Sequence, residues 1–79
     1  MLTLFVKTGC PFSAKVREAA AGMAIPLHEK NIAEPGVREE FLSAGGIDKT
    51  PYLVDDERQV SMGESEDIIV YLKEHYENA

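Results

Sequence analysis

The stretch that decides how this chain folds is Lys7-Thr8-Gly9-Cys10-Pro11-Phe12-Ser13, which holds the single cysteine among 79 residues. Residues 2–6, Leu-Thr-Leu-Phe-Val, lead into it with the mostly aliphatic, aromatic and β-branched pattern, with little alternation, of a strand buried on both faces. A helix is predicted from Pro11 to about Ala24, because proline suits the first helical position, where its missing N–H costs nothing. A thiol therefore lies on the turn between a buried strand and a helix.

The position of Cys10 predicts a reactive thiolate. A free cysteine has a pKa near ~8.5, and both a helix N-terminus and a neighbouring cation lower that pKa. The unpaired N–H groups of the first helical turn would face the sulfur, and Lys7 is close enough along the chain to fold back toward it. Isolated cysteines are more commonly small buried hydrophobes, but the flanking Gly9 and Pro11 favour a turn and a reactive thiol.

The hydrophobic pattern predicts further strands and helices along the whole chain. The strands are expected at residues 27–32, 51–54 and 59–62, and the helices at 37–42 and 64–76. The strand at 27–32 is polar in its middle, which suits a sheet edge, and residues 55–58 are predicted to be a polar hairpin turn. The resulting order, β-α-β-α-β-β-α, predicts an α/β fold with a four-stranded mixed sheet flanked by three helices, whose first βαβ unit is parallel.

Composition and charge narrow the class of protein. With 44% hydrophobic and 28% charged residues, the chain is predicted to fold as one small domain, residues 1–79. A net charge of −6 disfavours nucleic acid and anionic membrane surfaces as partners, and no apolar run approaches the ~20 residues that span a bilayer. One cysteine cannot close an internal disulfide, and an unpaired thiol suits a reducing compartment, so we expect a cytoplasmic monomer.

Three segments together resemble the glutaredoxin family. They are Cys10-Pro11-Phe12-Ser13 after a buried strand, Thr50-Pro51 opening a later strand, and Gly63-Glu64-Ser65 opening the last helix. The segments follow the family's order and fall at matching element boundaries, so that the resemblance covers essentially the whole chain. It implies a thioredoxin-like fold with a groove that binds glutathione as co-substrate.

The resemblance also implies roles for single residues near the thiol. Cys10 would be the attacking cysteine, with Lys7 as the basic residue that precedes it and Phe12 as a wall of the groove. The pair Thr50-Pro51 resembles a segment whose proline is cis and whose preceding backbone pairs with the cysteine part of glutathione. Phe12 also begins the apolar stripe of its helix, and only about 5–6% of X–Pro bonds are cis, so ordinary structural roles stay open for these residues.

Two further sites follow from the same resemblance. Glu64-Ser65 would receive the γ-glutamyl end of glutathione, since backbone N–H groups at a helix start bind a carboxylate. Arg38 falls close to a family position that contacts the glycine carboxylate together with Lys7. Plain helix capping would equally explain Glu64-Ser65, and a solvated helix face would explain Arg38.

At Ser13 the sequence departs from the pattern of dithiol glutaredoxins, and this difference decides the implied mechanism. Dithiol glutaredoxins carry a second cysteine there, which resolves a mixed disulfide with a protein, and a serine cannot do so. The implied function is a monothiol thiol–disulfide oxidoreductase that acts on glutathionylated proteins or small thiols. Cys10 would take glutathione from the mixed disulfide, and a second glutathione would then regenerate the thiol.

Other functions stay open. Monothiol glutaredoxins of the Cys-Gly-Phe-Ser type bridge a [2Fe–2S] cluster between two subunits through one cysteine each and two glutathiones. Phe12-Ser13 matches that type, with Cys10 as the cluster ligand, but Pro11 replaces its glycine. Glu64-Ser65 also resembles glutathione transferases, although the chain ends without their all-helical second domain, so that a free-standing transferase is not expected. A glutathione-binding module with little turnover is the remaining possibility.

Overall fold

The computed structural model describes residues 1–47 and 49–77. Its elements are β1 (Leu2–Val6), α1 (Pro11–Gly22), β2 (His28–Asn31), α2 (Val37–Ser43), β3 (Tyr52–Asp55), β4 (Val60–Met62) and α3 (Ser65–His75). The predicted order of strands and helices is confirmed, and the predicted boundaries differ from these by at most two residues.

The strands form a single four-stranded sheet in the order β2-β1-β3-β4. β1 pairs in parallel with β2, with Thr3 opposite His28, and antiparallel with β3, with Leu4 opposite Leu53. β3 and β4 form the antiparallel hairpin. Every residue of β1 is buried, as its pattern with little alternation predicted, and the polar strand β2 lies at an edge.

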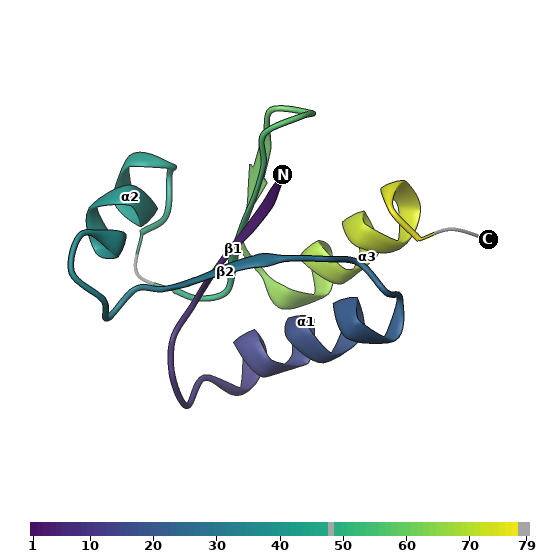
Figure 1. Ribbon diagram of the computed structural model, residues 1–79, viewed down its shortest axis with the longest axis horizontal. Coiled ribbons are helices and arrows are strands. Elements are labelled where there is room, and N and C mark those ends of the chain that lie inside the picture. Colours follow the sequence, from purple (N-terminus) through teal and green to yellow (C-terminus); the bar gives the residue numbers. More distant parts are fainter. Residues whose placement is uncertain (48, 78–79) are drawn as a thin grey trace.

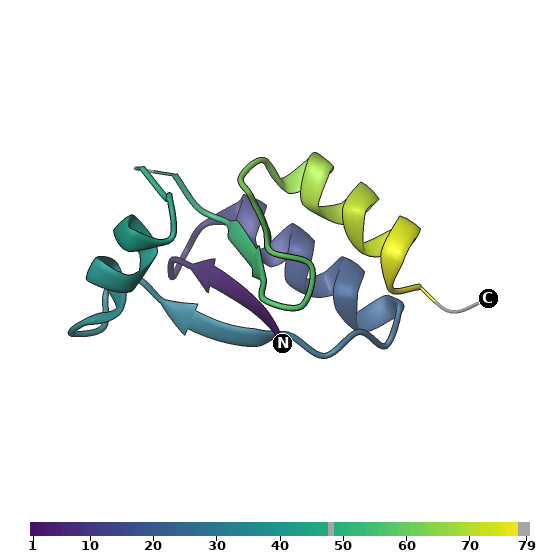
Figure 2. The same ribbon diagram turned by 90° about the horizontal axis from the view of Figure 1, so that it is seen from above.

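The helices divide between the two faces of the sheet. Figure 1 shows α1 and α3 together on one side of β1 and α2 on the other. Figure 2, turned by 90°, shows that α1 and α3 run side by side in the same direction and begin at the same end of the molecule. In residues 1–47 and 49–77, no helix is long and apolar enough to cross a membrane.

The alternation of side chains along β1 builds two cores. Leu2, Leu4 and Val6 point toward α1 and α3, where they join a cluster that also includes Leu53, Val16, Ala20, Ile25, Ile68, Tyr71 and Leu72. Phe5 points to the opposite face, where its ring lies 5.6 Å from that of Phe41 of α2. Phe41 in turn packs edge-on against Tyr52. One buried aromatic residue thus holds α2 to the sheet.

The prediction that residues 55–58 form a polar turn is wrong for Asp55. It is the last residue of β3 and is fully buried, with 0% of its surface exposed. Its carboxylate accepts hydrogen bonds from the hydroxyls of Tyr71 (2.6 Å) and Tyr76 (2.5 Å), and from the backbone N–H groups of Glu57 and Arg58. Asp55 therefore ties the hairpin turn to the end of α3.

The same hydrogen bonds keep Asp55 ionised inside the protein. Burial alone would raise its pKa, but the hydroxyls of Tyr71 and Tyr76 and the two backbone N–H groups lower it below the ordinary value of 3.8. The pKa of Tyr71 is raised in return, by its burial and by the neighbouring carboxylate. A carboxyl whose pKa is lower in the folded state stabilises the fold most when it is ionised.

We predict that Asp55→Ala lowers the free energy of unfolding by roughly 3 kcal/mol at neutral pH, because the buried hydroxyl of Tyr71 and three partly buried donors lose their acceptor. The difference from wild type should be constant above the ordinary carboxyl pKa of 3.8 and shrink as the pH falls below it. Urea unfolding at several pH values measures both effects. Asp56→Ala, at the exposed neighbour, is the control and should change stability by less than about 0.5 kcal/mol. Equal effects of the two variants would contradict the assignment.

Candidate active site

The loop between β1 and α1 places the thiol at the start of a helix. Gly9 has a φ of +80°, a backbone conformation that glycine adopts without steric cost, and the Cys10 N–H donates to the Lys7 carbonyl at 3.1 Å. Cys10 is the N-cap residue of α1, with extended backbone angles, and Pro11 is the first helical residue. The predicted strand–turn–helix around Cys10 is therefore confirmed.

The thiol opens onto a groove of about 680 Å³. Its walls are formed by residues 7–12, 49–51 and 64–66, which lie far apart in the sequence. The groove brings together most of the residues that the sequence singled out: Lys7, Cys10, Pro11, Phe12, Thr50, Pro51, Glu64 and Ser65. Phe12 is 59% exposed, so it is a wall of the groove and not a core residue.

Thr50 and Pro51 lie directly against the thiol. The Thr50–Pro51 peptide bond is cis, as the resemblance implied. The Cys10 thiol donates a hydrogen bond of 3.7 Å to the Thr50 carbonyl. Pro51 is buried and begins the approach to β3, so the segment is held by the sheet while Thr50 faces the groove.

The pKa of Cys10 is lowered from its ordinary value to about 7. Burial raises it, but the nearby hydroxyls of Ser13 and Thr50 and the backbone N–H groups of Ser13 and Phe12 favour the ionised sulfur and outweigh the burial. The contribution predicted for the helix N-terminus is thus confirmed. The predicted contribution of Lys7 is not among these causes, because its side chain is exposed to solvent and the thiolate is held by uncharged donors.

The first turn of α3 forms another wall of the groove. Ser65 is its first residue and is 7% exposed, and Glu64 before it has a φ of 65°, which is uncommon for a residue other than glycine. Because α1 and α3 begin at the same end of the molecule (Figures 1 and 2), the unpaired N–H groups of both helices lie at the groove. This wall suits the carboxylate of a ligand.

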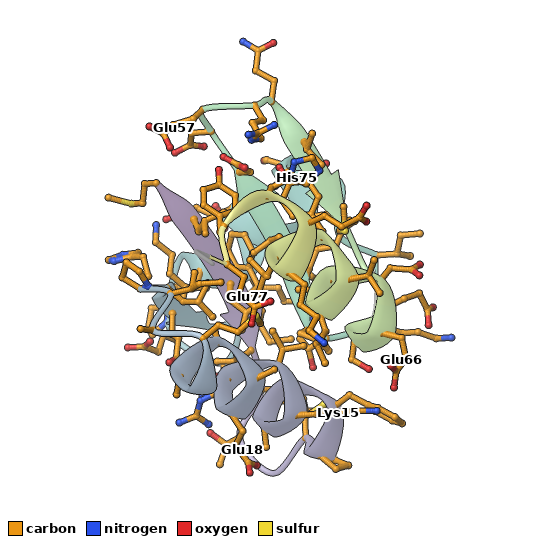
Figure 3. The ribbon with its side chains drawn as sticks, turned by 90° about the vertical axis from the view of Figure 1, so that its right-hand side faces the viewer. Lys15, Glu18, Glu57, Glu66, His75 and Glu77 are labelled. Atoms are coloured by element: carbon orange, nitrogen blue, oxygen red, sulfur yellow. The ribbon has the colours of Figure 1, made fainter. Side chains whose placement is uncertain are left out.

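Charged side chains of both signs line the groove. Lys7 and Lys49 carry positive charge, and Glu64 and Glu66 carry negative charge. Lys15 of α1 forms an ion pair with Glu66 of α3, and Figure 3 shows the two side chains extending toward each other. Both partners are largely exposed, so the pair adds little stability. A lining of this kind suits a zwitterionic ligand despite the net charge of −6.

Two of the predicted site residues do not line the groove. Arg38 is an exposed residue at the start of α2, outside the groove, and its contact with the glycine carboxylate stays a prediction. Ser13 is buried beneath the first turn of α1. In contrast, Lys49 and Glu66 line the groove, although the sequence did not predict them as site residues. Lys49 adjoins the predicted segment Thr50-Pro51, and Glu66 adjoins Ser65.

A metal site does not form from the described side chains alone. In residues 1–47 and 49–77, no three histidine, cysteine, aspartate or glutamate side chains come together as metal ligands. For an iron–sulfur cluster the groove offers one thiol, so the remaining donors would have to come from outside the chain.

A sheet of this topology, with a thiol at the start of its first helix and a cis proline opposite, defines a domain of the thioredoxin-like fold. The chain belongs to the family described as "Glutathione S-transferase, N-terminal domain", which matches residues 4–79. The glutaredoxin resemblance is therefore confirmed for the fold, whereas the family is that of the transferase N-terminal domain.

Solved structures of glutathione transferases share this fold. Human glutathione transferase theta-2, in complex with glutathione and an unknown ligand, is 28% identical with a TM-score of 0.81, and the match covers 100% of this chain and 33% of that one. Glutathione S-transferase unclassified 2 from Bombyx mori is 23% identical with a TM-score of 0.83, over 99% of this chain and 37% of that one. Glutathione transferase E6 from Drosophila melanogaster is 24% identical with a TM-score of 0.79, over 100% and 36%.

The chain thus spans about a third of the length of the transferase structures that it matches. A comparison with curated proteins gives no match.

We predict that the rate of Cys10 alkylation by iodoacetamide reaches half its maximum near a pH of about 7. Lys7→Gln should move this midpoint by less than about half a unit, because exposed charges interact weakly in water. Thr50→Val, which removes a hydroxyl donor, should raise it by about one unit. A larger shift in Lys7→Gln than in Thr50→Val would contradict the assignment of the low thiol pKa to uncharged donors.

Proposed function

We propose that this chain is a glutathione-dependent thiol–disulfide oxidoreductase that acts on glutathione mixed disulfides by a monothiol mechanism. The observation that carries the proposal is a cysteine of pKa about 7 in a groove whose other walls suit an anionic peptide. Membership of the transferase N-terminal domain family supports glutathione as that peptide. A complex with glutathione in the human theta-2 structure supports the same ligand.

Each part of glutathione would have a contact in this groove. The γ-glutamyl carboxylate would accept hydrogen bonds from the first turn of α3 and from the Ser65 hydroxyl, and Glu64 would meet the amino group. The central cysteine would pair with the backbone of Thr50, which places its sulfur beside Cys10. Lys7 and Lys49 would meet the glycine carboxylate, and Phe12 would cover the peptide from the side.

The proposed reaction requires the sulfur of Cys10 to lie next to the sulfur of bound glutathione. The Cys10 thiolate attacks the glutathione sulfur of a mixed disulfide, forms a Cys10–glutathione disulfide and releases the other thiol as a thiolate, which takes a proton from water. A second glutathione thiolate then attacks the glutathione sulfur on Cys10. The products are glutathione disulfide and the Cys10 thiolate, so that electrons balance without another reductant.

Glutathione conjugation to an electrophile is the second candidate, because the chain belongs to a transferase domain family. In conjugation, the nucleophile is the sulfur of glutathione, and the protein supplies hydrogen-bond donors to it. In this groove the protein itself presents an ionised sulfur at the place where glutathione would react. That thiolate favours disulfide exchange over conjugation.

We predict turnover of a small glutathionylated thiol in the presence of glutathione, with a rate that rises as the pH passes through about 7. Cys10→Ser should abolish this turnover, whereas Ser43→Ala, at the exposed end of α2, should leave it unchanged. A coupled assay for glutathione disulfide measures both. Full activity in Cys10→Ser would overturn the proposal. Conjugation of an aromatic electrophile without disulfide exchange would identify a transferase instead, and a brown protein from anaerobic purification with glutathione would identify a cluster carrier.

We also predict that Ser65→Ala weakens glutathione binding by about 5- to 30-fold, the effect of losing about 1–2 kcal/mol of hydrogen bonding. The measurement is calorimetry in a Cys10→Ser background, where no covalent disulfide can form. Ser61→Ala, at an exposed position of β4, is the matched control and should bind as the background does. Unchanged affinity in Ser65→Ala would place the γ-glutamyl end elsewhere.

A further inference from the structure

A side-chain hydrogen bond joins the loop after β1 to the neighbouring strand β2. Asn31 is the last residue of β2 and pairs with Val6, the last residue of β1. The Ile32 N–H donates to the Val6 carbonyl at 2.9 Å, so that the two strands stay together up to the start of the loop. The Asn31 side-chain nitrogen Nδ2 then donates to the Thr8 hydroxyl at 2.8 Å. Thr8 is therefore held by a strand that does not itself line the groove.

The direction of this hydrogen bond is fixed by a second contact of the same amide. The Asn31 side-chain oxygen Oδ1 accepts a hydrogen bond of 2.9 Å from the Ala33 N–H. If the amide were turned over, its NH₂ group would face the Ala33 N–H, and two donors would oppose each other. The Asn31 backbone carbonyl also accepts from the Glu34 N–H at 3.0 Å, which holds the residue in a turn. The Thr8 oxygen is therefore the acceptor in its contact with Asn31.

The Thr8 hydroxyl keeps its own hydrogen for a different partner. A hydroxyl has one hydrogen to donate and two lone pairs, and an amide N–H can occupy only a lone pair. Thr8 is exposed and lines the groove between Lys7 and Cys10. The backbone that carries it is fixed as well, because the Cys10 N–H donates to the Lys7 carbonyl at 3.1 Å and closes a turn. Thr8 thus presents an oriented O–H group at the wall of the groove.

The glycine end of glutathione is the part of the proposed ligand that would meet this wall. The γ-glutamyl end is assigned to the first turn of α3 and the central cysteine to Thr50, so that the remaining carboxylate would lie toward Lys7, the residue before Thr8. An ionised carboxylate can only accept, and a hydrogen bond to it is stronger than one between neutral groups. A fixed hydroxyl beside an exposed lysine adds direction to a charge that solvent otherwise weakens.

We propose that Thr8 is a glutathione-binding residue whose O–H donates to the glycine carboxylate, and that Asn31 is the positioning residue that turns this hydroxyl toward the groove. The inference rests on the proposed function in that the ligand is glutathione. It concerns binding alone, so it does not depend on which reaction Cys10 carries out. The pair would favour peptides that end in a free carboxylate over those in which this group is blocked.

Calorimetric titration of glutathione into a Cys10→Ser background tests the role of Thr8 without turnover. Thr8→Val, which has the same shape but no hydroxyl, should weaken binding by about 3- to 10-fold, and Thr8→Ser should recover most of that loss. Glutathione esterified at its glycine carboxylate lacks the charged acceptor, so Thr8→Val and the background should bind it almost equally. A Thr8→Val affinity for glutathione equal to that of the background, or an equal loss for glutathione and its ester, would overturn the inference. No binding of glutathione to the background would overturn the proposed function together with it.

Asn31→Asp tests the positioning role in the same background. The carboxylate keeps an acceptor for the Ala33 N–H but can only accept from Thr8, so that the Thr8 hydrogen turns away from the groove. Affinity for glutathione, measured at high salt to screen the added charge, should fall about as far as in Thr8→Val. The double variant should be weaker than Thr8→Val by less than about twofold, because both changes remove the same hydrogen bond. Gln59→Glu, the same amide-to-acid change at an exposed turn, is the control and should bind as the background does. Losses that multiply in the double variant would show that Asn31 does not act through Thr8.

Discussion

The burial of β1 on both of its faces is the constraint on which the rest of this structure depends. Leu4 is completely buried against α1 and α3, and Phe5, one residue later, is buried against α2. A strand with no solvent-facing side must have neighbours on both edges and cover on both faces, and in a small domain these requirements use nearly every other element. From the end of β1 the chain turns into α1, and Cys10 is the N-cap residue of that helix.

The chemistry of the site comes from uncharged groups that the fold orients. The thiolate is stabilised by hydroxyl groups and by backbone N–H groups of the first turn of α1, and no charged side chain is among the causes of its low pKa. An arrangement of this kind loses little to salt or solvent, because its donors are short-range and fixed by packing. It also explains how an acidic chain can maintain an anionic sulfur and offer an anion-binding wall at α3.

Contacts between segments that are far apart in the sequence hold the groups of the site together. Cys10 meets Thr50 from a segment forty residues away, and Ser65 arrives from a third segment because α3 packs alongside α1. Asp55 has a related role at the opposite end of α3. Its carboxylate fastens the hairpin to Tyr71 and Tyr76, so that the helix whose first turn lines the groove is anchored at its last turn.

The sequence by itself determined the order of elements, the central strand and the reactive turn. These depend on local signals, namely a mostly apolar run at residues 2–6, a glycine and a proline around Cys10, and helical spacing after them. Only the tertiary structure decided the burial of Asp55, the place of Lys49 and Glu66 on the groove, and the position of Arg38 outside it. The same holds for the hydrogen bond from Asn31 to Thr8 and for the small part of Lys7 in the thiol pKa. Burial, hydrogen-bond partners and electrostatic distances are set by residues that are remote in sequence, so that no local pattern contains them.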